Sequence, residues 1–164
     1  MRLQALSTRR LGLAVAAVVV ALDQATKAWV VAALDQGDPW ELIPGFFQIA
    51  HIRNPGAAFG LLRGAGSYIA LGAVVAVVVI VLVIRKVERG YDAVALGLVL
   101  GGAIGNLLDR IFRGDGLLDG RVVDFLDFSF FPAFNVADSA ITVGAALALL
   151  EVVSARSAQQ SPTS

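Results

Sequence analysis

The sequence predicts an all-α integral membrane protein with four transmembrane helices. Of its 164 residues, 57% are hydrophobic and only 16% are charged, and the mean hydropathy is +0.77. A soluble domain of this composition would have too little polar surface to cover itself. A helix needs roughly 20 apolar residues to cross about 30 Å of hydrocarbon. Four segments approach or exceed that length: 11–34, 67–84, 93–112 and 137–153.

Basic residues predict the orientation of these spans, because Lys and Arg accumulate in cytoplasmic loops. They precede the first span, fill the loop between the second and third, and follow the fourth: Arg2, Arg9, Arg10, Arg85, Lys86, Arg89 and Arg156. We therefore expect both termini in the cytoplasm and the two other loops on the outer side. Residues 1–156 are expected to form one membrane-embedded domain, and the polar stretch 157–164 a disordered tail.

The first outer loop has a strand-like pattern. Its segment WELIPGFFQIAHIRNPGAAFGLL alternates apolar and polar residues between Pro and Gly breaks, which favours short strands. Asn54 precedes Pro55 in this segment, so we expect Asn54 in an extended or turn conformation. Aromatic residues of both outer loops either anchor the protein at the membrane surface or contact a substrate: Trp40, Phe46, Phe47, Phe130, Phe131 and Phe134.

Two charged residues lie inside the first span. Asp23 is twelve residues beyond Leu11, which is about 18 Å along a helix. An ionised side chain at such a depth costs about 2.5 to 3.5 kcal/mol. Lys27 lies four residues later on the same helix face, so the two groups can pair. This pair either only neutralises itself or belongs to a functional site.

The third span ends in a polar cluster, within GGAIGNLLDRIF. Gly101 and Gly105 form a small-xxx-small face that allows close helix packing. Asn106, Asp109 and Arg110 follow at spacings of three and four, so they project on one side at the outer end of the helix. The cluster either satisfies its own hydrogen bonds or faces a site.

Two carboxylates of the second outer loop are expected at the same membrane depth. Asp124 is flanked by apolar residues in RVVDFLDF, and Asp138 lies at a helix start in NVADSA. Asp138 alone could be a helix cap. Together they could share one proton and activate a water, as in aspartic proteolysis. The helix N-terminus then favours ionised Asp138, and the apolar flanks favour protonated Asp124.

Other chemistries fit less well. The chain has no cysteine, which excludes disulfides, thiolate metal sites and a cysteine nucleophile. His51 is the only histidine, is expected at the surface, and belongs to no HExxH helix, so we expect no zinc site. Asp124 and Asp127 lack the basic phosphate cradle of magnesium-dependent phosphotransfer. Thirteen basic and thirteen acidic residues cancel, so no nucleic-acid partner is expected. We also expect no cofactor.

Five motifs, in this order on four spans, resemble those of the lipoprotein signal peptidases, the type II signal peptidases of bacteria: LDQATK, RNPGAAFG, GGAIGNLLDRI, VVDFLDF and PAFNVADSAI. The resemblance covers residues 22–141 and implies an intramembrane aspartyl protease that cleaves diacylglyceryl-modified prolipoproteins just before the lipidated cysteine. It implies that Asp124 and Asp138 are catalytic. It also implies supporting or substrate-binding roles for the remaining motif residues: Asp23, Lys27, Asn54, Asn106, Asp109, Arg110 and Asn135.

The resemblance further implies a small extramembrane β-sheet cradle in the first outer loop, a multi-pass location in the bacterial inner membrane, and an active site at the outer face. We expect the substrate and membrane lipids as partners and a monomeric enzyme. The alternative is a small carboxylate-relay transporter or a scaffold. The two halves of the chain show no evident internal repeat, which many transporters have.

Overall fold

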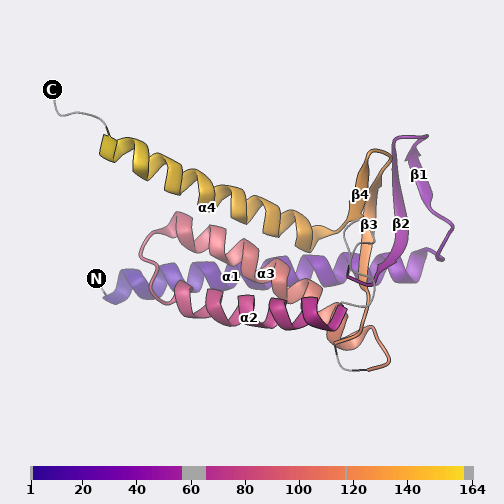
Figure 1. Ribbon diagram of the computed structural model, residues 1–164, viewed down its shortest axis with the longest axis horizontal. Helices are drawn as coiled ribbons and strands as arrows, with labels where there is room; N and C mark the ends of the chain where they lie inside the picture. The colour runs from indigo at the N-terminus through magenta and orange to yellow at the C-terminus, as the bar shows by residue number, and fades with distance from the viewer. Residues whose placement is uncertain (1, 57–65, 117, 161–164) are drawn as a thin grey trace.

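A bundle of four helices carries a small β-sheet across one end (Figure 1). The structure is a computed structural model and describes residues 2–56, 66–116 and 118–160. The helices are α1 (Arg2–Ala33), α2 (Gly66–Ile84), α3 (Gly90–Phe112) and α4 (Val136–Gln160). The strands are β1 (Trp40–Ile43), β2 (Phe47–Asn54), β3 (Val122–Phe128) and β4 (Phe131–Phe134). Both α1 and α4 have their free ends at the end of the bundle opposite the sheet (Figure 1).

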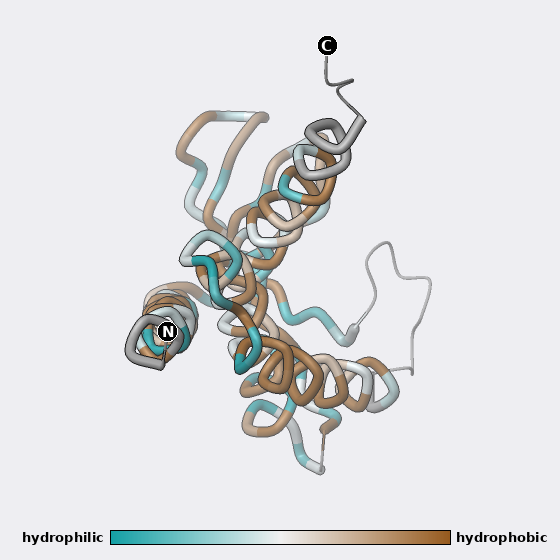
Figure 2. Tube along the Cα trace, turned by 90° about the vertical axis from the view of Figure 1, so that its left-hand side faces the viewer, coloured by the Kyte–Doolittle hydropathy of each residue, from teal (hydrophilic) through white to brown (hydrophobic). Residues whose placement is uncertain are grey.

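Three helices are long and apolar enough to cross a membrane, over Leu6–Ala33, Gly90–Phe112 and Val136–Ser154, and the described part of α2 is a shorter apolar helix, Tyr68–Ile84. Hydrophobic residues line the helices and hydrophilic residues concentrate in the connecting segments (Figure 2). The helices also extend beyond the predicted apolar spans, since a helix need not end where hydrocarbon ends. In particular, α4 continues to Gln160, four residues into the expected tail, and residues 161–164 lie outside the described part.

Helix α3 is the centre of the bundle because its glycines allow two neighbours to approach closely. A Cβ atom on Gly97 would meet Gly12 of α1, and one on Gly101 would lie 2.7 Å from the Ala16 carbonyl oxygen. On the other side of α3, a Cβ on Gly102 would overlap the carbonyl oxygen of Ala137 in α4. The predicted packing role of Gly101 is therefore confirmed, and the structure adds Gly97 and Gly102.

The two segments that the sequence predicts as outer loops, between α1 and α2 and between α3 and α4, both contribute to the sheet, which has the antiparallel order β1-β2-β3-β4. The prediction of strands in the first outer loop is confirmed by β1 and β2, but the prediction of a sheet in that loop alone was incomplete. The pairing of β2 with β3 places Ile52 opposite Asp124. Such long-range pairing depends on tertiary contacts, which a local alternation pattern does not encode. Residues 57–65 of the first outer loop lie outside the described part.

An apolar core attaches the sheet to the bundle. Val30 and Leu34 at the end of α1 pack against Val123 and Phe125 of β3, and all four are buried. At the sheet's hairpin ends, Phe46 and Phe130 have ring centroids 5.6 Å apart. Alternate residues of β3 face this core, which leaves Asp124 directed to the opposite side.

Candidate active site

Asp124 and Asp138 line the same groove, whose volume is about 940 Å³. Asp124 comes from the middle of β3, where it is 2% exposed. Asp138 comes from the first turn of α4 and is half-buried. The apolar wall of the groove includes Ile52, Phe134 and Val143. The two carboxylates that the sequence singled out, fourteen positions apart, thus face one partly apolar cavity.

Asn135 connects the two carboxyl groups. Its side-chain Nδ2 donates to Asp124 Oδ1 at 2.7 Å, and its Oδ1 accepts the backbone N–H of Asp138 at 2.9 Å. In return, the Asp138 carboxylate accepts the backbone N–H of Asn135 at 3.3 Å. This reciprocal pattern is a capping box. The capping role considered for Asp138 is therefore present, and the same carboxylate also faces the groove.

Each carboxylate receives a further amide hydrogen bond. Asn54, at the end of β2, donates from Nδ2 to Asp124 Oδ2 at 2.9 Å. Asn106, in the last turns of α3, donates from Nδ2 to Asp138 Oδ1 at 2.8 Å. Three asparagines, one at the end of β2, one in α3 and one immediately before α4, therefore fix the two carboxyl groups. The sequence predicted all three residues as site-supporting, and the structure brings all three to the groove.

Burial dominates the ionisation of Asp124. Removal from water raises the pKa of the Asp124 carboxyl from its usual range to about 6. The hydrogen bond from Asn54 opposes this rise, and the negative charge of Asp138 adds to it. Asp124 can therefore hold a proton under mildly acidic conditions where an exposed aspartate is ionised.

A buried ion network lies behind the carboxylates. Lys27 Nζ is 2.9 Å from Asp23 Oδ2 and 2.9 Å from Asp109 Oδ2, and all three side chains are fully buried. The predicted pairing of Asp23 with Lys27 is confirmed. Asp109 also binds Arg113 Nε through its Oδ1, at 2.7 Å. Each of these buried aspartates is therefore paired with at least one cation, as a buried carboxylate requires.

Gln24 and Arg113 belong to this network and were missed by the sequence analysis. Gln24 Nε2 donates to the carbonyl oxygen of Gly105 at 3.0 Å and lies 3.1 Å from Asp23 Oδ2. A polar amide within an apolar span was the available signal for Gln24. Arg113 lies just beyond the predicted end of the third span, where its spacing of four from Asp109 was the signal.

Arg110 also lines the groove. The residue is 7% exposed, and its NH1 atom has no hydrogen-bond partner among the described residues. The sequence predicted that Asn106, Asp109 and Arg110 face one side, but in the structure their side chains face two different sites. Asn106 and Arg110 lie towards the two carboxylates, whereas Asp109 is directed into the ion network.

His51 was expected at the surface, and this expectation is wrong. It is 8% exposed, and its Nδ1 lies 3.0 Å from the carbonyl oxygen of Leu34. His51 can donate from Nδ1 to this carbonyl at the end of α1. The contact joins β2 to the first helix, which a local pattern of alternating residues does not reveal.

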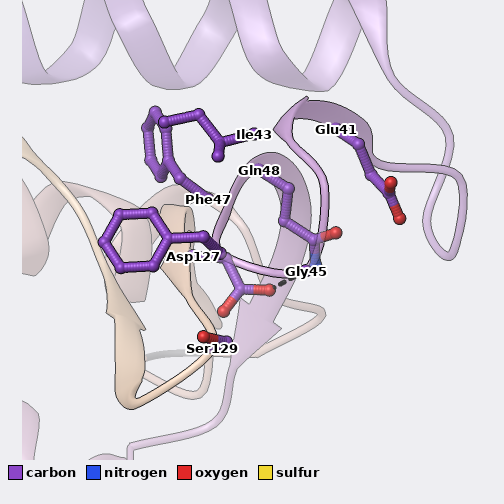
Figure 3. Close-up of a pocket in the computed structure, with 8 residues that line it drawn as sticks. Glu41, Ile43, Gly45, Phe47, Gln48, Asp127 and Ser129 are labelled. Atoms are coloured by element: carbon purple, nitrogen blue, oxygen red, sulfur yellow. Dashed lines mark hydrogen bonds between the residues drawn. The ribbon is translucent and has the colours of Figure 1, made fainter.

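A second, smaller hollow of about 130 Å³ lies on the sheet (Figure 3). Gln48 and Asp127 from neighbouring strands face each other there, and Gln48 Nε2 donates to Asp127 Oδ2 at 2.6 Å. This contact is chemically the same as that of Asn54 with Asp124. Asp127 lines the groove as well, whereas Gln48 lines only the smaller hollow, so a change at Gln48 offers a matched control for the groove.

Comparisons with known proteins agree on one family. The family model described as "Signal peptidase (SPase) II" matches residues 15–154. The lipoprotein signal peptidase of Rhodococcus jostii is 45% identical over 133 residues, covering 81% of this chain and 67% of that protein. The lipoprotein signal peptidase of Brevibacillus brevis is 44% identical over 142 residues, covering 84% of this chain and 91% of that protein.

Solved structures agree with the fold. A bacterial membrane enzyme determined by the in meso method superposes with a TM-score of 0.81 at 31% identity, covering 93% of both chains. A second bacterial membrane enzyme determined by the same method has a TM-score of 0.74 at 34% identity, covering 86% of this chain and 91% of that one.

Proposed function

The chain belongs to the signal peptidase II family, and we propose that Asp124 and Asp138 are its catalytic pair. The activity of the family is the removal of signal peptides from prolipoproteins. The observation that supports the pair is their convergence from β3 and α4 on one groove and on one residue, Asn135, which binds Asp124 through its side chain and the Asp138 carboxylate through its backbone N–H. Two carboxyl groups that share a site and a proton are the machinery of aspartic proteolysis.

In the proposed reaction, ionised Asp138 takes a proton from a water molecule held between the two carboxyl groups. The water oxygen attacks the carbonyl carbon of the scissile bond, while protonated Asp124 donates its proton to the carbonyl oxygen. The resulting gem-diol collapses when the proton on Asp138 passes to the amide nitrogen and the C–N bond breaks. Asp124 recovers its proton from a hydroxyl group, so each turnover consumes one water.

The surroundings of the two carboxyl groups support this assignment. Asp138 lies in the first turn of α4, where the partial positive charge of a helix N-terminus favours a carboxylate. Asp138 also accepts hydrogen bonds from Asn106 and from the Asn135 backbone. Burial raises the pKa of the Asp124 carboxyl to about 6. We therefore assign the base role to Asp138 and the proton to Asp124.

The charges around the groove also favour one shared proton. The charged groups of the groove and of the ion network behind it are five carboxylates and four cations: Asp23, Asp109, Asp124, Asp127, Asp138, Lys27, Arg53, Arg110 and Arg113. With every group ionised, the cluster has a charge of −5 + 4 = −1. A single proton on the catalytic pair makes the cluster neutral, which is the less costly state in a low-dielectric environment.

We propose that the protein is a single multi-pass domain of the bacterial inner membrane in which α2 completes a set of four spans. Both termini are cytoplasmic and the groove is at the outer face. The first third of α1 and the loop between α2 and α3 lie at the end of the bundle away from the sheet (Figure 1), and their basic residues support this orientation: Arg9, Arg10, Arg85 and Lys86. We further propose that the monomer is active, because both carboxyl groups and the three asparagines that bind them belong to the same chain.

We propose that the substrate is a prolipoprotein whose cysteine already carries diacylglycerol, cleaved just before that cysteine. The apolar wall of the groove suits a substrate that remains in the membrane. Each buried CH₂ group contributes about 0.8 kcal/mol of anchoring, so extraction of two acyl chains into water would be prohibitive. An active site at membrane depth avoids this extraction.

Purified protein in lipid bilayers tests the proposed substrate. We expect it to cleave a diacylglyceryl-modified prolipoprotein and to leave the unmodified precursor intact, with mass spectrometry locating the cut before the modified cysteine. Equal cleavage of both forms would contradict lipid-dependent recognition. Failure to cleave several modified precursors would contradict the proposed function and favour a transporter or scaffold role.

The pH dependence tests the proton assignment. Because protonated Asp124 is the acid, kcat/KM should fall as pH rises through about 6, where Asp124 loses its proton. An Asn54→Ala variant removes a hydrogen bond that favours ionised Asp124, so the pKa of Asp124 rises. We therefore expect the alkaline limb of the profile to move to higher pH by about one unit.

Gln48→Ala is the matched control, because Gln48 makes the same kind of bond to Asp127 on the same two strands. We expect its profile to coincide with that of the wild-type protein. An alkaline limb that Asn54→Ala leaves in place would show that Asp124 is not the titrating acid.

A further inference from the structure

We propose that Lys27 is a positioning residue that sets the geometry of both catalytic carboxylates without touching the substrate. The proposal rests on the proposed function of Asp124 and Asp138. Lys27 is fully buried and does not line the groove. Its influence is transmitted through Asn106 and through two backbone N–H groups, and it goes beyond the neutralisation of Asp23.

The Lys27 ammonium group has three acceptors, from two helices. Its Nζ lies 2.9 Å from Asp23 Oδ2, 2.9 Å from Asp109 Oδ2 and 2.9 Å from Asn106 Oδ1. An ammonium group has three donors, so these contacts use its full hydrogen-bonding capacity. Neutralisation of Asp23 would require only the first contact, within α1. The other two contacts join α1 to the end of α3.

The contact with Asn106 decides which side of its amide faces Asp138. Asn106 Oδ1 accepts from Lys27, and also from Asn135 Nδ2 at 3.2 Å. Asn106 Nδ2 is therefore left to donate to Asp138 Oδ1 at 2.8 Å. The flipped amide would place its NH₂ against the ammonium group and its oxygen against the carboxylate, and both contacts would be repulsive. Lys27 thus ensures that Asp138 receives a donor.

The two carboxylate partners of Lys27 hold the backbone beside each catalytic residue. Asp109 Oδ2 accepts the N–H of Val123, immediately before Asp124, at 3.1 Å. Asp23 Oδ1 accepts the N–H of Ala137, immediately before Asp138, at 3.0 Å. One buried cation therefore links both strand β3 and helix α4 at the position preceding the reactive group. A displacement of about 1 Å at such a position can cost roughly 100-fold in rate.

A charge-compensated variant separates positioning from neutralisation. Lys27→Met alone leaves two buried carboxylates with one cation fewer and can prevent folding. The double variant Asp23→Asn/Lys27→Met removes one charge of each sign, and the amide introduced at position 23 retains an oxygen that can accept the Ala137 N–H. We expect this double variant to fold and to lower kcat by about 100-fold, with KM for a diacylglyceryl-modified prolipoprotein within about threefold of wild type because Lys27 does not line the groove.

Arg89→Met/Glu151→Gln is the control, because it also removes one charge of each sign from an ion pair, but from a largely exposed pair at the opposite end of the bundle. We expect kcat of this control to equal that of the wild-type protein. Wild-type kcat in the compensated double variant would show that Lys27 only neutralises Asp23. Failure of the compensated variant to fold, judged by thermal unfolding, would assign Lys27 to folding. Either result would overturn the proposal.

Double-mutant cycles test the route through Asn106. In the Asp23→Asn background, the effects of Lys27→Met and Asn106→Ala on kcat should overlap, so that the combination costs little more than either change alone. The fold-reductions in kcat caused by Lys27→Met and by Asn54→Ala should multiply when the two are combined, since Asn54 binds Asp124 independently, from β2. Independent effects of Lys27 and Asn106 would contradict the proposal. Retained activity in Asp124→Asn and Asp138→Asn would instead refute the catalytic pair, which distinguishes the two failures.

Discussion

Replacement of either proposed catalytic carboxyl group, Asp124 or Asp138, by an amide should abolish turnover while preserving the fold. We expect Asp124→Asn and Asp138→Asn each to lower kcat by about 10⁴-fold, the upper end of what a positioned general acid or base supplies. The amide has nearly the same shape, so the contacts of both positions with Asn135 can largely persist. It cannot exchange protons with water or with the scissile carbonyl. Gel-shift cleavage of a diacylglyceryl-modified prolipoprotein at matched protein concentrations measures the loss.

Asp115→Asn is the control for this pair. Asp115 is an exposed carboxylate in the loop between α3 and β3, outside the groove. We expect its activity to equal that of the wild-type protein. Thermal unfolding of both catalytic variants should stay close to that of the wild type. If either catalytic variant kept full activity while folded, the pairing of Asp124 with Asp138 would be wrong.

Gly102→Ala should be the most damaging single-methyl substitution in the bundle. The added Cβ would overlap the Ala137 carbonyl oxygen and lie 2.7 Å from Ile141 Cγ1, so α4 must move away from α3. Overpacking of this kind typically costs about 1 to 3 kcal/mol of unfolding free energy. The shift occurs next to Asp138, so we also expect kcat to fall by about 100-fold. Thermal unfolding and the cleavage assay measure the two effects.

Gly72→Ala is the matched control, with the same chemical change in another helix. Among the described residues, no atom outside the local backbone lies within 4 Å of a Cβ added at Gly72 in α2. Alanine is the better helix former by about 1 kcal/mol, so we expect unchanged or slightly higher stability and unchanged activity. If Gly102→Ala and Gly72→Ala had the same stability and activity, the close approach of α3 to α4 could not be the cause of the expected losses.

Polar residues within apolar segments explain why so much of the site was predictable. A charge in hydrocarbon is costly, so its presence at Asp23 signals either a partner or a function. Helix periodicity then identified Lys27 as that partner, and the contact of 2.9 Å confirms it. The same reasoning selected Asn106, Asp109 and Arg110 as one cluster. Helix periodicity does not predict that the Asp109 side chain binds Lys27 whereas the Asn106 side chain binds Asp138.

The second outer loop illustrates the opposite case. Its sequence suggested a helix start at Asp138 but no pairing of Val122–Phe128 with the first outer loop. The antiparallel register of β2 with β3 places Asn54 within 2.9 Å of Asp124, across seventy positions of sequence. His51 was wrongly expected at the surface for the same reason, because its partner is the carbonyl of Leu34 in another element. Contacts of this range depend on packing, which no local pattern specifies.

The sequence by itself determined that the chain forms apolar membrane helices and that Asp23 pairs with Lys27, and it singled out Asp124 and Asp138 as the candidate carboxyl groups. These features follow from the cost of polar groups in lipid and from helix periodicity, both of which are local properties. Only the tertiary structure decided that Asn135 is bound to both carboxyl groups and that Lys27 links α1 to the end of α3. Such contacts arise because glycines let α3 approach both α1 and α4, and because two distant hairpins share one sheet.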